Sequence, residues 1–239
     1  MKRTKAKHTV LVLPDMQAPF IHRDSLPFVK AVIKQYNPDR LIQIGDLFDG
    51  HALSRYDHDP DGFSAGDELA AAVKSLQPYY KALRNVTVVK GNHDARLERL
   101  AYSVGIPKRC LNPLEMILEF PDDWKYVDRV SIDGVDYEHG HKFGNGGGAS
   151  AFKRSIDSNM TSTVYGHFHS KAGIMWFANA KYLNFAFNVG CLMDTKSYAA
   201  QYGDSYLDRP ILGVGLIIKG IPTYIPMVLV KGGRWRGYL

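Results

Sequence analysis

The chain has 239 residues, of which 45% are hydrophobic and 23% charged, and its net charge is +6. This composition is that of a folded globular protein, and we expect one domain over residues 1–239. No apolar run reaches the roughly 18 residues that cross a bilayer, which excludes a membrane-spanning protein. The two cysteines, Cys110 and Cys191, form no disulfide framework, so we expect a cytoplasmic protein.

The excess of positive charge favours an anionic partner. Basic residues concentrate at both ends of the chain, at Lys2, Arg3, Lys5, Lys7, Lys231, Arg234 and Arg236. If the ends lie near the functional site, they would contact a nucleic-acid backbone. The alternative is that they are solvated tails.

The first ninety residues alternate between strand-like and helix-like patterns. Short apolar runs predict three strands, at His8–Leu13, Asp39–Ile44 and Asn85–Val89. Apolar residues at helical spacing predict helices between them, at Ser25–Gln35 and Asp67–Leu83. This order is typical of a parallel α/β sheet, in which ligands bind at the carboxyl ends of the strands.

Beyond residue 95 the pattern becomes more mixed. The expected elements are an interrupted helix at Arg96–Glu119, a hairpin at Val127–Tyr137, a glycine-rich loop at Asn145–Gly148, a helix at 149–158 and a strand at Thr163–Tyr165. From Ile174 onward strand-like runs alternate with turns. This alternation predicts a second, more antiparallel sheet that faces the first.

Five segments rich in carboxylate, amide and imidazole groups each follow an apolar, strand-like run. They are PDMQ at 14–17, GDLFD at 45–49, GNHD at 91–94, EHGH at 138–141 and GHFH at 166–169. Together they offer the ligands of two divalent cations, and this donor set suits manganese, iron or zinc better than calcium. The leading hypothesis is therefore hydrolysis of a phosphate ester by a metal pair.

In this order the five segments resemble the calcineurin-like metallophosphoesterase family, over about residues 9–190. The resemblance implies an α/β fold with a two-sheet mixed β-sandwich flanked by helices. It also implies two divalent metal ions, with manganese as our first choice and iron, zinc, nickel or magnesium as alternatives. By position Asp46 would bridge both ions. The other implied ligands are Asp15, Gln17 and His169 for the first ion, and Asn92, His139 and His167 for the second.

The resemblance also implies catalytic roles. His93 would lie beside the substrate and protonate the leaving oxygen, with Asp49 orienting its ring. A hydroxide bridging the two metals would attack phosphorus in line.

Three positions leave alternatives open. Gln17 stands where the family usually has histidine, so it is either a weaker metal ligand or a residue that contacts a ligand or the substrate. His139 fits the family's ligand position, which leaves His141 to bind substrate phosphate or to hold a neighbour in place. Arg96 either binds a substrate phosphate or pairs with Glu98 or Glu68.

The remaining histidines, His8, His22, His51 and His58, lie outside the motifs and are expected at the surface or in structural roles. Among them, His51 follows GDLFD closely enough to reach the cleft.

Three functions compete. The first is a phosphodiesterase acting on DNA, RNA or nucleotides, because GDLFD resembles the DNA-processing nuclease branch of the family. The second is a phosphomonoesterase, disfavoured because Gly50 and His51 stand where protein phosphatases carry arginine and glycine. The third is a metal-binding scaffold without turnover, against which His93 and Asp49 argue.

Overall fold

The computed structural model describes residues 6–55, 59, 61–144, 149–200 and 208–239. Several expectations concern residues outside these ranges. They are the basic residues Lys2, Arg3 and Lys5, the loop Asn145–Gly148, and His58.

The first sheet has six strands in the order β11-β10-β1-β2-β3-β4. Strands β1 to β4 run parallel, and β10 and β11 extend the sheet antiparallel beside β1. The bounds are β1 Thr9–Leu13, β2 Arg40–Gln43, β3 Val86–Val89, β4 Lys125–Val127, β10 Gly213–Ile218 and β11 Ile221–Pro226.

The second sheet has five strands in the order β5-β6-β7-β9-β8. Its central strands β6, β7 and β9 are parallel, and the edge strands β5 and β8 are antiparallel to their neighbours. The bounds are β5 Val130–Ile132, β6 Val135–Tyr137, β7 Ser162–Tyr165, β8 Gly173–Ala178 and β9 Leu183–Asn188. A separate hairpin pairs β12 (Leu229–Val230) with β13 (Arg234–Trp235).

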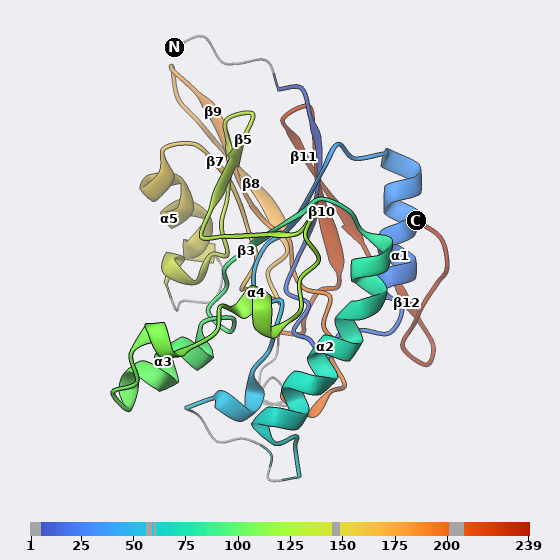
Figure 1. Ribbon diagram of the computed structural model, residues 1–239. Helices are drawn as coiled ribbons and strands as arrows, with labels where there is room; N and C mark the ends of the chain where they lie inside the picture. The colour runs from blue at the N-terminus through green and yellow to red at the C-terminus, as the bar shows by residue number, and fades with distance from the viewer. Residues whose placement is uncertain (1–5, 56–58, 60, 145–148, 201–207) are drawn as a thin grey trace.

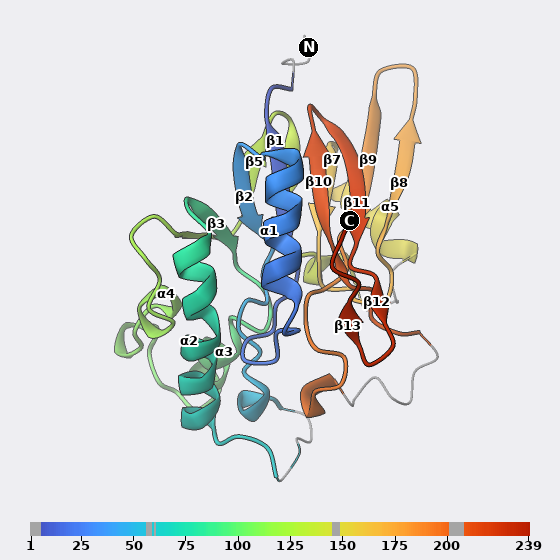
Figure 2. The ribbon, with the colours of Figure 1, turned by 90° about the vertical axis from the view of Figure 1, so that its right-hand side faces the viewer.

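Helices cover both outer faces of this two-sheet sandwich. Helices α1 (Ser25–Tyr36) and α2 (Ala65–Ala82) lie on one side of the molecule, and α5 (Ala149–Asn159) lies on the other (Figure 1). The view turned by 90° places α1 and α2 nearest the viewer, with α5 behind (Figure 2). Among the described residues, none of the helices combines the length and apolarity needed to cross a bilayer.

The sequence of strand β1 is continuously apolar because the strand is covered on both faces. Val10 and Val12 pack between the two sheets, whereas Leu11 and Leu13 pack in the cluster that contains the α1 and α2 residues. Because successive side chains of a strand point to opposite faces, a strand covered on both sides needs apolar residues throughout. Strand β1 therefore lies between the second sheet on one face and helices α1 and α2 on the other.

The predicted α/β sandwich with flanking helices is confirmed. The three early strands and two early helices lie within two residues of their expected bounds. The hairpin around Asp133 and Gly134 is also present, between β5 and β6.

One expectation needs correction. Residues after Ile174 do not build a separate antiparallel sheet, because β10 and β11 join the first sheet and β8 and β9 join the second. The segment Arg96–Glu119 is helical with interruptions at the prolines, as the sequence predicts. It forms three short pieces separated by Pro107 and Pro113, namely α3 Arg96–Ser103, the 3₁₀ turn η2 Lys108–Cys110 and α4 Leu114–Ile117.

Candidate metal centre

All five polar segments lie at the same end of the sandwich. They directly follow β1, β2 and β3 of the first sheet and β6 and β7 of the second. Because these strands run parallel within their sheets, their carboxyl ends gather at one edge. Residues far apart in sequence are thereby brought within hydrogen-bond distance.

Asp15, Gln17 and His169 form the first of two adjacent groups of donor atoms. The fully buried Asp15 places its Oδ2 2.9 Å from His169 Nε2, and the backbone N–H of His167 donates to the same oxygen at 3.1 Å. Gln17 is also buried, with its Nε2 3.3 Å from Asp46 Oδ2. Within the described part of the chain, Gln17 Oε1 is buried without a hydrogen-bond partner. An amide oxygen without a hydrogen-bond partner is free to coordinate a metal ion.

Asp46, Asn92, His139 and His167 form the second group. His139 Nε2 lies 3.1 Å from Asp46 Oδ2 and 3.0 Å from Asn92 Oδ1. One donor atom each from Asp46, His139 and His167 lie within 4.8 Å of one another, so these three side chains could hold a metal ion. His139 Nδ1 donates to the carbonyl oxygen of Ile44 at 3.1 Å, which directs Nε2 toward the group.

The charges around His139 favour a cation at this position. Burial would lower its pKa, but the Asp46 and Asp15 carboxylates outweigh burial and raise the pKa to about 10. Burial would likewise raise the pKa of Asp46, yet His139 and His93 hold that pKa well below its usual range. The buried carboxylates therefore demand positive charge from either a proton or a metal ion.

His93 and Asp49 contact each other beside the second group. His93 Nδ1 lies 3.0 Å from Asp49 Oδ1, and its backbone N–H donates to Asp46 Oδ1 at 2.8 Å. Burial would lower the pKa of His93, but Asp46 and Asp49 raise it. The nearest carboxylate atom to His93 Nε2 is Asp46 Oδ2 at 3.8 Å, so the ring lies beside the donor groups.

Arg96 holds the loop that carries Asp49. Its guanidinium donates to the carbonyl oxygens of Asp49 and Gly50 at 3.0 and 3.1 Å, and to His93 Nε2 at 3.1 Å. The ion pairs considered from the sequence are not its contacts in the described structure. Glu98 pairs with Lys90 at 2.7 Å, and Glu68 accepts the backbone N–H groups of His51 and Ala52.

His141 lies next to His139 and lines the cavity. The rings of His141 and His139 are 5.6 Å apart, and those of His141 and His167 are 6.4 Å apart. Burial lowers the pKa of both His141 and His167 to about 4, so both rings are neutral. His141 Nδ1 is buried and has no hydrogen-bond partner among the described residues.

Asp94, the last residue of GNHD, positions the bridging candidate Asp46, a role that the sequence left unassigned. Its carboxylate accepts the backbone N–H groups of Asp46, Phe48 and Gly91 at 2.8 to 3.0 Å. Burial, with the Asp46 charge, raises the pKa of Asp94 to about 6. Gly91 allows this approach, because a Cβ there would lie 2.1 Å from Asp46 N and Oδ1.

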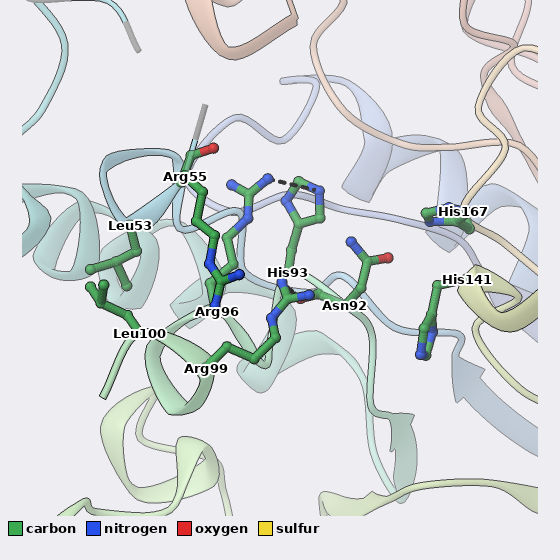
Figure 3. Close-up of a pocket in the computed structure, with 10 residues that line it drawn as sticks. Leu53, Arg55, Asn92, His93, Arg96, Arg99, Leu100, His141 and His167 are labelled. Carbon is green, nitrogen blue, oxygen red and sulfur yellow. Dashed lines mark hydrogen bonds between the residues drawn. The ribbon is translucent and has the colours of Figure 1, made fainter. Parts of the chain in front are cut away.

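A cavity of about 570 Å³ opens beside the donor groups. It is lined by Leu53, Ser54, Arg55, Asn92, His93, Arg96, Arg99, Leu100, His141 and His167. His141 and His167 lie at one end of this cavity, and Leu53 and Leu100 at the other, with arginine side chains between them (Figure 3). Arg55 and Arg99 are functional candidates that only the fold reveals, although Arg96 and Arg99 stand at i, i+3 spacing on a helix and so share a face.

The other described histidines have structural contacts. His22 Nε2 donates to the carbonyl of Gly233, and His8 contacts Asp133 at 3.0 Å. His51 is buried, with Nδ1 3.9 Å from Asp49 Oδ2 and its ring against Tyr198. His51 therefore lies beside Asp49 and is not one of the residues that line the cavity.

The described basic residues of the chain ends do not line the cavity; they are Lys7, Lys231, Arg234 and Arg236. Lys7 precedes β1, at the opposite end of the sheet from the polar segments, and its backbone N–H donates to Asp133. Arg234 forms two hydrogen bonds with Asp24 at 2.7 and 2.8 Å. The basic charge near the centre comes instead from the arginines of the cavity.

Comparison with known proteins shows the family to which the chain belongs. The profile of the calcineurin-like phosphoesterase family matches residues 8–190. The Gene 54 proteins of Mycobacterium phages D29 and L5 are 26% and 24% identical to the chain, and each match covers 95% of both proteins. A metallophosphoesterase from Sphaerobacter thermophilus is similar with a TM-score of 0.45 and 13% identity, covering 96% of this chain and 89% of that one.

The fold and the converging donors define a protein of the metallophosphoesterase class. The chain belongs to the calcineurin-like phosphoesterase family.

Proposed function

We propose that the chain is a single-domain hydrolase that uses two divalent metal ions to cleave phosphodiesters of nucleic acids or nucleotides. Manganese is the first choice of metal, with iron, zinc, nickel and magnesium as alternatives. One ion would be held by Asp15, Gln17, Asp46 and His169, and the other by Asp46, Asn92, His139 and His167. The observation that carries the proposal is the convergence of these donors at one end of the two sheets, where Gln17 Oε1 is buried without a partner.

Bound ions would supply an activated hydroxide for in-line attack on phosphorus and would neutralise charge on the phosphoryl oxygens. The protein would position and protonate the leaving group. Asp49 holds His93 Nδ1, which leaves Nε2 as the atom that faces the cavity. Arg96 donates to this Nε2 in the structure, so His93 must release that contact before it passes a proton to the leaving oxygen.

The cavity supports a diester as substrate. A phosphodiester carries a second organic group that must be accommodated beside the scissile phosphate. The space of about 570 Å³ next to His93 has the size of a small-molecule site. Its arginines suit a substrate that carries more than one negative charge.

A substrate panel with Mn²⁺ tests the proposal. The substrates are bis-p-nitrophenyl phosphate, p-nitrophenyl phosphate, single-stranded DNA and duplex DNA. We expect turnover of bis-p-nitrophenyl phosphate and of at least one DNA substrate. Turnover of the monoester alone would replace this proposal by a phosphomonoesterase.

Metal binding without any turnover would identify a scaffold instead. The panel therefore needs a parallel measurement of metal content by mass spectrometry. A cytoplasmic location stays a prediction from the cysteines, and fractionation of expressing cells tests it.

A further inference from the structure

Two separate elements place arginines around the same cavity. The 3₁₀ turn η1 (His51–Leu53) leads directly into Arg55, and α3 carries Arg96 and Arg99. Residues three apart on a helix share a face, so Arg96 and Arg99 both reach the cavity. Figure 3 shows the three guanidinium groups gathered between the leucines and His93.

The side chains that line the cavity change in polarity and charge from one end to the other. His141, His167 and Asn92 lie on the side of the donor groups, followed by His93 and then by the arginines (Figure 3). Leu53 and Leu100 form the far end. A substrate held with its scissile phosphate at the donor groups would therefore extend past His93 into a cationic and then an apolar region.

The charge of this region is not balanced by the residues that line it. Among the described lining residues there are three arginines and no aspartate or glutamate. Arg96 is partly offset by Asp49, whose Oδ2 lies 3.9 Å from its guanidinium. Arg99 donates one hydrogen bond to the carbonyl oxygen of Asn92 at 2.7 Å, which leaves its positive charge uncompensated by a carboxylate at that contact.

We propose that Arg55, Arg99, Leu53 and Leu100 form a subsite for the next nucleotide of a single-stranded nucleic acid. The two arginines would bind the phosphate adjacent to the scissile one, and the two leucines would pack against its base or sugar. This inference rests on the proposed function of the neighbouring centre.

The size of the cavity selects a single strand. The volume of about 570 Å³ lies within the range of small-molecule sites, roughly 300–1,000 Å³, and a ligand of that size is much smaller than a duplex. A base pair embedded in a duplex keeps its edges and stacking partners occupied, so its base cannot reach the leucines. Proteins that bind single strands contact the faces of unpaired bases, mainly with aromatic side chains, and here Leu53 and Leu100 would supply the apolar surface.

Equilibrium binding tests the subsite without catalysis. A fluorescent 12-nucleotide single-stranded DNA is titrated with the protein in EDTA and followed by anisotropy. The double variant Arg55→Ala, Arg99→Ala should raise the dissociation constant at least tenfold. It should also reduce the slope of log K against log salt by about 0.7, the value expected for loss of the one phosphate contact that the two arginines share.

Arg84→Ala is the control, because it removes one of the two positive charges that the double variant loses, at a side chain that is 69% exposed and precedes β3, at the other end of the sheet. It should bind as the wild type does. Equal binding by the double variant and the control would overturn the subsite. A duplex of the same sequence gives a second arm, and an equal loss of duplex binding in the double variant would contradict a single-strand subsite.

Kinetics with Mn²⁺ separate this inference from the function on which it rests. The double variant should lose at least tenfold more kcat/KM on the single-stranded DNA than on bis-p-nitrophenyl phosphate, which has no second phosphate. Equal losses on both substrates would overturn the subsite while leaving the phosphodiesterase intact. No hydrolysis of any diester by the wild type would overturn the proposed function, and the binding experiment would still decide the subsite.

Discussion

His93→Ala separates proton transfer from metal binding. The substitution removes an imidazole whose Nδ1 lies 3.0 Å from Asp49 Oδ1 and whose Nε2 is 3.8 Å from Asp46 Oδ2. The backbone N–H that donates to Asp46 Oδ1 is retained, because alanine has the same main chain. The variant should therefore keep the geometry of Asp46 and lose only the side chain.

The expected magnitudes follow from these contacts. Loss of a positioned acid lowers kcat about 10²–10⁴-fold, which corresponds to about 2.7–5.4 kcal/mol in activation free energy. Loss of the hydrogen bond to the Asp49 side chain removes about 1.5–3 kcal/mol of unfolding free energy. For a chain of 239 residues this lowers the melting temperature by about 3–12 °C.

The assay compares two diesters and measures metal content. A general acid matters most for a poor leaving group, so the rate loss should be larger on a dinucleotide than on bis-p-nitrophenyl phosphate, whose nitrophenolate leaves unaided. Metal content by mass spectrometry should equal that of the wild type. A fall in metal content would refute the assignment of His93 as a residue that binds no metal, and equal losses on both substrates would refute its role as the acid.

Three further changes test other parts of the structure. Gln17→His should lower one of the two Mn²⁺ dissociation constants about tenfold or more, because imidazole binds transition ions better than a neutral amide. Calorimetric titration measures both constants, and if neither changed, Gln17 would not be a metal ligand. Gly91→Ala should abolish activity and metal binding, because its Cβ would lie 2.1 Å from Asp46 N; full activity would contradict this packing. A hydrogen bond from Arg234 lowers the pKa of Asp24 to about 2, below the usual 3.9. The stability that Asp24 contributes is therefore present above about pH 4 and lost as pH falls toward 2. In urea unfolding, the difference between wild type and Asp24→Asn should shrink over that range, and a constant difference would contradict the ion pair.

The early part of the fold could be predicted from local pattern. Strand β1 is apolar on both faces and is followed at once by the buried Asp15, so both its position and the site at its end were visible in the sequence. The same reasoning placed Asp46 after β2 and Asn92 after β3. Parallel strands then brought these residues to one edge.

Strand partners could not be predicted in the same way. The runs that form β10 and β11 look like any antiparallel hairpin, and nothing local shows that β10 pairs with β1. Register and sheet membership depend on packing between residues about 200 positions apart, as in the pairing of Thr9 with Ile218. The sequence therefore revealed the strands but not the sheet they would join.

Within the candidate site, the polar motifs were easier to predict than the residues that support them. Asp94 acts through three backbone N–H groups, and such contacts have no signature in residue spacing. Arg55 and Arg99 come from different elements and meet only in the folded chain. The sequence leaves Arg96 either at a phosphate or in an ion pair with Glu98 or Glu68. Its contacts to the carbonyl oxygens of Asp49 and Gly50 depend on tertiary structure.

The central claim is that Asp46 lies between two metal ions. Anomalous diffraction from crystals grown with Mn²⁺ tests it most directly. We predict two manganese peaks, one contacting Asp15 and His169, the other contacting His139 and His167, with Asp46 bound to both. A single peak, or peaks that do not touch Asp46, would contradict the account.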